Sequence, residues 1–163
     1  MCCKLASAVM VTVALLAATA AKANDWLTYQ NDRYGTTIDY PAIFKMQRPP
    51  DSDDGRAFKS ADGADFTVSA SYFALDSTVA KYHAFIVKNL DADSAVAYEQ
   101  HGKNWFVISG TRADKIFYEK HLLSHGLNED FVMSYPASAK STYDPIVVRM
   151  AKSFRSGKGF QSP

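Results

Sequence analysis

The chain has 163 residues, of which 47% are hydrophobic, and its 18 basic and 17 acidic residues nearly cancel. A balance of this kind offers no electrostatic footprint for nucleic acid or for an anionic membrane surface. The length suits a single domain with an ordinary hydrophobic core.

The first 23 residues are typical of a secretory signal peptide. Lys4 supplies the positive start, residues 5–21 are apolar and small, and Ala21-Lys22-Ala23 is an A-x-A cleavage signal. We therefore expect cleavage between Ala23 and Asn24. An uncleaved N-terminal anchor is the alternative, but the apolar run is short and Ala-rich beside the ~20 strongly apolar residues of a transmembrane helix.

Cleavage at this point has consequences for the mature chain. Cys2 and Cys3 precede the apolar segment, whereas a lipidated cysteine follows it directly, so we expect no lipid anchor. Removing 23 of the 163 residues leaves 140 without a cysteine, and losing Lys4 and Lys22 changes the formal charge from +1 to −1. The sequence thus predicts a periplasmic or secreted protein with no disulfide and no stable membrane anchor. Its single domain should span residues 24–155, before a flexible tail at 156–163.

Four strands are predicted before the first helix, at residues 26–29, 34–40, 56–60 and 65–75. Asp62-Gly63 fits the turn of a hairpin between the last two. The segment 42–55 is predicted to be a loop, because it contains Pro49-Pro50 and an acidic, glycine-terminated run.

A helix is predicted over residues 78–90, with Asp76 or Ser77 as its N-cap. Its apolar side chains recur at helical spacing; they are Val79, Tyr82, His83, Ile86 and Leu90. A β-meander should follow, with strands at 95–100, 105–110, 115–123 and 131–136, and 124–130 as a loop.

The last predicted element is a helix ending near Phe154. Asp144 before Pro145 resembles an N-cap followed by proline at the first helical position. Runs of strands without strict strand–helix alternation indicate an antiparallel sheet with helices packed on it, which is an α+β domain.

Glu119, His121 and His125 are the strongest chemical candidates, because all three could bind zinc or transfer protons. Their order is E-x-H-x-x-x-H, and the zinc protease motif requires H-E-x-x-H on a helix. Ile116 and its neighbours favour a strand instead. A solvated strand face running into a turn is the simpler interpretation. The alternative is a hydrolase or metal-dependent enzyme, which requires His125 to fold back over His121.

The remaining candidates have ordinary structural explanations. His83 lies within an apolar helix face, where a packed histidine is expected. The Asp-rich run at 51–55 lacks the ligand spacing of a calcium loop, and Ser109 is not in a G-x-S-x-G elbow. No phosphate-binding or dinucleotide-binding glycine motif occurs, so no cofactor is predicted.

Aromatic residues near the start of the mature chain leave two possibilities open. Trp26, Tyr29 and Tyr34, together with Arg33, could form an exposed binding patch, since these residue types dominate interface hot spots. The same aromatic side chains could equally belong to the core.

Five separated stretches resemble uncharacterised exported proteins of bacteria; they are YQNDRYGTTIDYP, DGRAFKSADGADFTVSA, NWFVISGTR, IFYEK and YPASAKSTYDPIVVRMAKSF. The early "YG…I.YP" strand and the closing strand-"YP"-helix ending in "SF" also resemble the PsbP-like fold. That fold is also seen in a nuclear-transport GTPase-binding protein. The resemblance implies a central antiparallel sheet flanked by helices and an accessory or binding role, and it transfers no functional residue.

The sequence therefore predicts an exported, non-catalytic binding or accessory protein that acts on an envelope protein or a small ligand. A hydrolase or metal enzyme using Glu119, His121 and His125 is the second hypothesis. A structural protein of the envelope is the third.

Overall fold

The computed structural model describes residues 25–72 and 78–157. Within these ranges the strands are β1 (Trp26–Gln30), β2 (Thr37–Pro41), β3 (Lys45–Met46), β4 (Gly55–Lys59), β5 (Asp65–Tyr72), β6 (Ser94–His101), β7 (Trp105–Arg112), β8 (Lys115–Ser124) and β9 (Leu127–Pro136). The helices are α1 (Val79–Lys88), a short 3₁₀ helix (Ala137–Ala139) and α2 (Lys140–Ser153).

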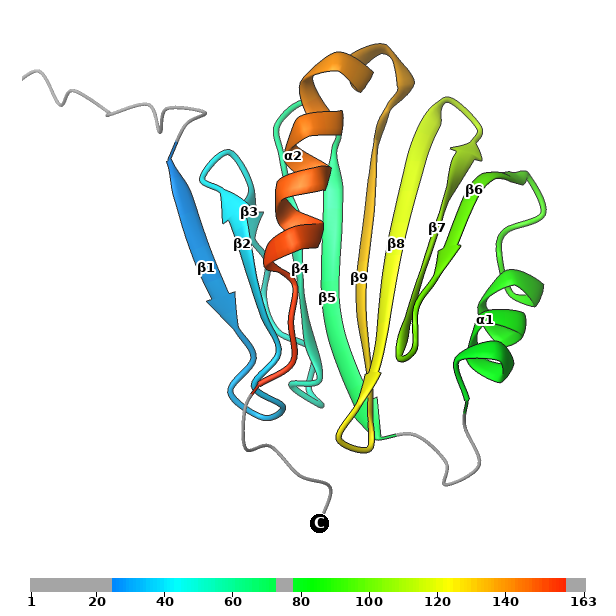
Figure 1. Cartoon of the computed structure of the whole chain (residues 1–163). Helices are drawn as coiled ribbons and strands as arrows, with labels where there is room; N and C mark the ends of the chain where they lie inside the picture. Colours follow the sequence, from blue (N-terminus) through cyan, green and yellow to red (C-terminus); the bar gives the residue numbers. More distant parts are fainter. Residues whose placement is uncertain (1–24, 73–77, 158–163) are drawn as a thin grey trace, which may run out of the picture.

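Seven strands form one antiparallel sheet in the order β3-β4-β5-β9-β8-β7-β6, and β1 and β2 pair in a separate hairpin. Figure 1 shows α2 in front of the sheet beside the β1–β2 hairpin, and α1 at the β6–β7 end. Successive strand residues face opposite sides. Because Tyr118 packs with the α2 core and Phe117 packs with α1, the two helices lie on opposite faces. The predicted α+β architecture is confirmed.

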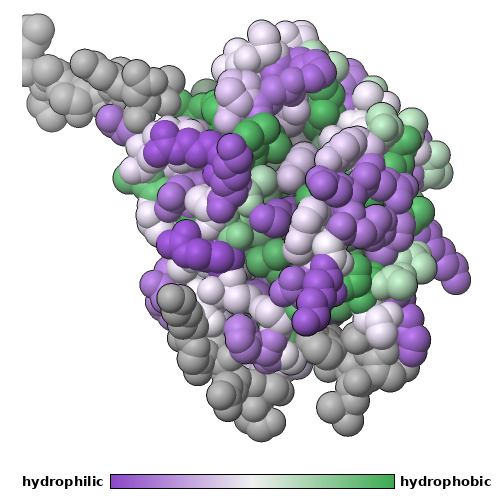
Figure 2. All heavy atoms as spheres, in the orientation of Figure 1, coloured by the Kyte–Doolittle hydropathy of each residue, from purple (hydrophilic) through white to green (hydrophobic). Residues whose placement is uncertain are grey.

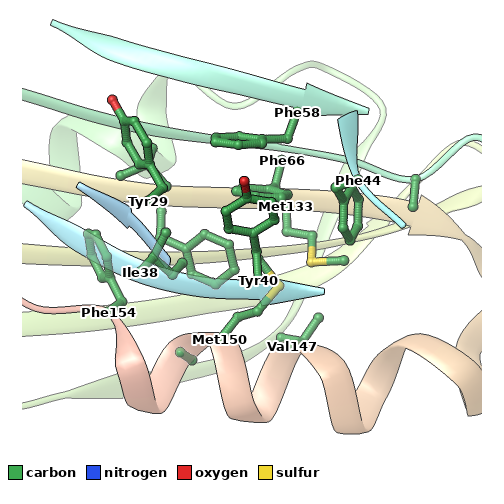
Figure 3. Close-up of a cluster of buried hydrophobic side chains, with 14 of the residues drawn as sticks. Tyr29, Ile38, Tyr40, Phe44, Phe58, Phe66, Met133, Val147, Met150 and Phe154 are labelled. Atoms are coloured by element: carbon green, nitrogen blue, oxygen red, sulfur yellow. The ribbon is translucent and has the colours of Figure 1, made fainter. Parts of the chain in front are cut away.

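The main core lies between the sheet and the layer formed by α2 and the β1–β2 hairpin (Figure 3). Phe58 and Phe66 stack at its centre, with ring centroids 4.3 Å apart and ring planes 5° apart. Tyr40 packs against both rings, and Met150 is fully buried on the helix side. Each buried aromatic side chain of this kind contributes about 1.5–3 kcal/mol to folding.

Helix α2 begins earlier than the sequence predicts, so the prediction of an N-cap at Asp144 is wrong. The helix starts at Lys140, and Pro145 lies inside it. Burial explains the difference: Tyr143 is completely buried, stacks on Tyr135 at 5.3 Å, and donates a hydrogen bond to Asp62 Oδ1 at 2.6 Å. These contacts outweigh the backbone hydrogen bond that a proline removes. Asp144 instead accepts a hydrogen bond from the Tyr135 hydroxyl.

Helix α1 is short, and it contains no buried residue. Its N-cap is Thr78, whose Oγ1 accepts a hydrogen bond from the Lys81 amide at 3.2 Å. The two predicted caps, Asp76 and Ser77, lie outside the described residues. His83 packs edge-on against Phe106 at 5.1 Å, as expected of a packed histidine on the inner face of the helix.

Two loop predictions are wrong. Residues 42–55 contain the short strand β3, which pairs with β4. Residues 124–130 form a tight hairpin, because His125 and Gly126 both adopt positive φ, at 52° and 76°, and β9 begins directly after them. Positive φ at both central residues is the geometry that the right-handed twist of a two-residue hairpin requires.

The aromatic residues at the start of the domain belong to its interior. Tyr29 and Tyr34 are 5% and 4% exposed, so the core interpretation is confirmed for both. Trp26 lies partly buried under the guanidinium of Arg149, 3.8 Å from the ring centroid. Arg33 lies over the Tyr34 ring and donates a hydrogen bond to the Ser52 carbonyl. No exposed aromatic patch forms from these four residues.

Candidate functional site

The structure brings together two of the three residues that the sequence singles out. Glu119 and His121 lie two apart on β8, on the face toward α1, with Oε2 and Nε2 3.1 Å apart. His125 lies in the turn beyond the end of β8. At ~3.3 Å per strand residue it is roughly 13 Å further along. His125 does not fold back over His121, and the arrangement required by the hydrolase hypothesis is not formed.

Asp130 occupies the place beside His121 that the hydrolase hypothesis required of His125. The two residues are register partners in the β8–β9 hairpin, and His121 Nδ1 lies 2.7 Å from Asp130 Oδ1. The Tyr82 hydroxyl of α1 donates to both Asp130 oxygens at 3.0 Å. Tyr82, Glu119, His121 and Asp130 are called the His121 cluster below. Residues placed symmetrically about a two-residue turn face each other, so recognising the His125–Gly126 turn would have identified Asp130.

The imidazole of His121 is enclosed on every side, so the solvated strand face expected from the sequence is wrong. Its side chain is 1% exposed, and its ring stacks on Phe106 with centroids 4.4 Å apart. Burial by itself would lower the pKa of His121, but the hydrogen bonds and charges of Asp130 and Glu119 outweigh it and raise the pKa above its usual value. Burial, together with the charge of Asp130, also raises the pKa of the Tyr82 hydroxyl.

The His121 cluster is therefore suited to structure and not to catalysis or metal binding. Both ring nitrogens of His121 already contact carboxylates, and the two carboxylates lie at opposite edges of the ring, so no single point lies among all three groups. Surface hollows of about 260 to 400 Å³ lie elsewhere on the described residues, and no cluster residue lines these hollows. A buried, hydrogen-bonded ion pair of this kind holds α1, β8 and β9 together.

One set of three metal-ligating side chains converges within residues 25–72 and 78–157. It consists of His83 on α1 with Glu99 and His101 on β6, and the ligand atoms lie within 4.8 Å of one another. No local sequence pattern marks this group, because His83 lies on a helix and Glu99 and His101 on a later strand, and only the packing of α1 brings them together. The Asp-rich run at 51–55 belongs to no such set; Asp53 forms an ion pair with Arg56.

On the opposite face of the sheet a long depression runs between α2 and the meander strands. It comprises two hollows of about 390 and 260 Å³ that share Tyr118 and Val148 as lining residues. Tyr98 and Tyr135 line the larger hollow, and Val148 and Tyr98 are 54% and 51% exposed at its rim. The whole depression is called the tyrosine groove below. Figure 2 views this face, on which hydrophobic residues are interspersed with hydrophilic ones.

A β-bulge shapes the outer wall of the tyrosine groove. The pairing of β6 with β7 shifts between Val96 and Tyr98, and the extra residue, Ala97, lines the groove. Gly110 lies opposite the bulge, where a Cβ atom would come within 2.0 Å of the Ala95 carbonyl oxygen. Glycine is therefore required at this position for the strands to approach closely.

Polar groups in the tyrosine groove are few and mostly engaged. Ser109 donates its hydroxyl hydrogen bond to the Phe117 carbonyl at 2.8 Å, so it is held within the sheet. Burial, and secondarily Tyr98, raises the pKa of Tyr118 to about 12, so this phenol is neutral at physiological pH. Lys120 donates to the Ala151 carbonyl, and burial lowers its pKa. The groove thus offers an aromatic surface with polar side chains toward both ends, Lys140 and Asp144 in one hollow and Gln100, Lys120 and Lys152 in the other.

Neither a family model nor a curated protein matches the chain. Among solved structures the chain is similar to cyanobacterial PsbP (CyanoP) from Synechocystis sp. PCC 6803, with a TM-score of 0.63, 14% identity, and coverage of 93% of this chain and 98% of that one. It is also similar to the Ran-binding protein Mog1p of Saccharomyces cerevisiae, with a TM-score of 0.58, 10% identity, and coverage of 80% and 95%.

A third similar structure comes from Bacteroides thetaiotaomicron, with a TM-score of 0.50, 10% identity, and coverage of 85% of this chain and 50% of that one. At these identities the similarity concerns the fold. The PsbP-like fold expected from the sequence is thus confirmed. None of the helices described here is long and apolar enough to cross a membrane.

Proposed function

We propose that this protein is an exported, non-catalytic binding or accessory protein of the cell envelope, and that the tyrosine groove is its binding surface. The observation that carries the proposal is the groove itself: about 390 Å³ of open, tyrosine-lined space that continues into a second hollow of about 260 Å³. One structural neighbour, the yeast Ran-binding protein, is by its name a binding protein, which is consistent with such a role on this fold. The predicted signal peptide at residues 1–23 supports export.

The shape of the groove favours a segment of a protein partner over a compact small molecule. Lining residues of α2 extend from Lys140 in one hollow to Lys152 in the other, which is roughly 18 Å of helix at 1.5 Å per residue. Tyrosine side chains present large, rigid, amphipathic surfaces at low entropic cost, and they are enriched where proteins meet. A partner segment that lays aliphatic or aromatic side chains along α2 would match this surface.

The hydrolase hypothesis finds no comparable support. His125 lies away from His121, and Asp130 and Glu119 contact both nitrogens of the imidazole. No side chain of the His121 cluster borders the hollows described above.

The experiment is a cross-linking capture from the envelope fraction of the native host, followed by mass spectrometry. Val148→Glu changes an exposed rim residue of the groove, so the variant should fold normally. We expect it to recover at least about tenfold less of the partner captured by the wild type, because a carboxylate at this position must lose water when an apolar partner segment covers it. Phe85→Glu is the matched control, since Phe85 is similarly exposed, at 59% against 54% for Val148, but lies on α1.

Two results would contradict the proposal. Equal recovery of the same partner by the wild type and Val148→Glu would exclude the groove as the binding surface. Mass spectrometry of the protein recovered from the host would test export separately. A mature N-terminus at Asn24 is expected, and a mass that still includes Met1 to Ala23 would exclude cleavage at the predicted site.

A further inference from the structure

At the junction between α1 and the edge strand β6 lies a group of side chains that belongs neither to the hydrophobic core nor to the tyrosine groove. His83 projects from α1, and Glu99 and His101 project from β6. Glu99 and His101 are two residues apart, so strand geometry puts them on the same side of the sheet. This side faces α1 and is opposite to the tyrosine groove.

The spacing of the three ligand atoms is close to that of a metal site. Metal–ligand distances of 2.0–2.2 Å in a tetrahedron place neighbouring ligand atoms roughly 3.3–3.6 Å apart. His83 Nε2 lies 3.1 Å from Glu99 Oε2, and His101 Nε2 lies 3.8 Å from the same oxygen. The remaining separation is no more than 4.8 Å. His101 is 45% exposed at the sheet edge, so a small rotation of its ring can close the third side of the triangle.

His83 Nε2 supplies a second, independent observation. This nitrogen is buried and has no hydrogen-bond partner among the described residues, although Glu99 Oε2 is 3.1 Å away. Buried polar atoms in proteins almost always have a partner. A metal ion bound by the Nε2 lone pair would satisfy this atom and would also neutralise Glu99.

The apolar surroundings hold the two imidazoles in place. The Phe106 ring forms the floor of the junction, 5.1 Å from the His83 ring and 6.2 Å from the His101 ring, measured between centroids. The two histidine rings are 4.6 Å apart and meet at 72°. Pre-positioned ligands over an apolar floor strengthen binding, because little side-chain freedom is lost when the ion enters.

We propose that His83, Glu99 and His101 form a binding site for Zn²⁺ or a similar divalent transition-metal ion. Two imidazole nitrogens and one carboxylate oxygen suit zinc, and three protein ligands leave the fourth position open to solvent. Alkaline-earth ions are disfavoured because they prefer ligand sets made of oxygen. The ion would link α1 to β6. This link matters because α1 has no fully buried residue and is otherwise held by partly buried apolar contacts and the hydrogen bond from Tyr82 to Asp130.

The test is a zinc titration of the full chain without an affinity tag. Cys2 and Cys3 are replaced by serine throughout, because thiols also bind zinc. The wild-type background should retain one zinc ion per chain after gel filtration, measured by elemental mass spectrometry. Each of the substitutions His83→Gln, Glu99→Gln and His101→Gln should weaken zinc affinity by at least about tenfold. Co²⁺ in place of Zn²⁺ should give visible absorption bands of a four-coordinate site, which these substitutions abolish.

His125→Asn is the matched control, since it removes a histidine outside the site and asparagine tolerates the positive φ of the turn. It should bind zinc as the wild type does. Hydrogen exchange supplies a readout independent of affinity: zinc should slow the exchange of α1 amides in the wild-type background and leave His101→Gln unaffected. His101 is exposed, so this variant remains informative even where His83→Gln fails to fold. Failure to retain stoichiometric zinc, unchanged affinity in His101→Gln, or loss of binding in the control would each overturn the proposal.

Discussion

The two faces of the seven-stranded sheet hold their covering helices in different ways. On one face α2 contributes four buried residues, Tyr143, Val147, Met150 and Ala151, to a continuous aromatic core. On the other face α1 contributes none, and it is held by partly buried apolar contacts and by the hydrogen bond from Tyr82 to Asp130. The comparison shows that α2 is held to the sheet by the packing of fully buried side chains, whereas α1 relies on partly buried contacts and on polar, titratable groups.

The largest expected effect is on the packed face. Phe66→Ala should lower the free energy of unfolding by about 3–5 kcal/mol, because it removes a fully buried ring that stacks on Phe58 and leaves a cavity. Phe85→Ala on α1 should change it by less than about 0.5 kcal/mol, since that ring is 59% exposed. Urea denaturation measures both. Similar losses for the two variants would show that the faces do not differ in this way.

A smaller loss is expected from the His121 cluster. Asp130→Asn should destabilise the protein by about 2 kcal/mol, because it weakens charge-assisted hydrogen bonds to His121 and Tyr82 in a mostly buried setting. Asp39→Asn provides a control, since the hydrogen bond between Thr28 and Asp39 is exposed. Urea denaturation at neutral pH compares the two. If Asp130→Asn is no more destabilising than the control, the cluster does not hold α1 to the sheet.

The same cluster predicts a pH dependence. The pKa of folded His121 lies above the ordinary value of 6.5, so the folded state binds the proton more tightly than the unfolded chain does. The stabilisation is complete below pH 6.5, and it is lost as the pH rises from there through the raised pKa. Stability should therefore fall over this window in the wild type, and the fall should be shallower in His121→Gln. Parallel stability curves for the two proteins would contradict the assignment.

The smallest effect is expected at Glu129, a completely buried carboxyl on the α2 face. Burial raises its pKa, although hydrogen bonds from Thr36 and Ser124 act in the opposite direction. Its ionised form is thus disfavoured in the folded state, and its contribution to stability declines as the pH rises above the ordinary value of 4.5. Glu129→Gln keeps an acceptor for Thr36, so stability at pH 7 should change by less than about 1 kcal/mol and should not decrease.

Thermal unfolding of Glu129→Gln at pH 5 and pH 7 checks this expectation. The melting temperature of the variant, taken relative to that of the wild type, should be higher at pH 7 than at pH 5. A clear loss of stability at pH 7 would mean that the carboxylate is ionised and needed by its hydroxyl partners.

Local patterns in the sequence were sufficient to predict the α+β architecture. Alternating apolar residues predicted most strands, and the Asp62-Gly63 turn predicted the β4–β5 hairpin. The start of α2 could not be predicted in this way, because the burial of Tyr143 outweighs the local signal of Asp144 and Pro145. The His125–Gly126 turn could not be recognised in the sequence, because the polar residues that follow it are typical of a loop. Glu129 and Asp130 are tolerated in a strand only because Thr36, His121 and Tyr82 satisfy them.

The candidate sites were harder to predict from the sequence than the fold was. Glu119 and His121 were recognised as neighbours on one face of a strand, but Asp130 required the hairpin register and Tyr82 required the packing of α1. His83, Glu99 and His101 are brought together by tertiary packing alone.

The bulge in β6 also affects how the protein behaves among other copies of itself. An edge strand of eight residues presents unpaired N–H and C=O groups that could template the addition of further strands. The register shift between Val96 and Tyr98 breaks the regular spacing of these groups along the edge. A bulged edge resists such pairing. Gly110, which permits the bulge, thus helps to protect the protein against aggregation.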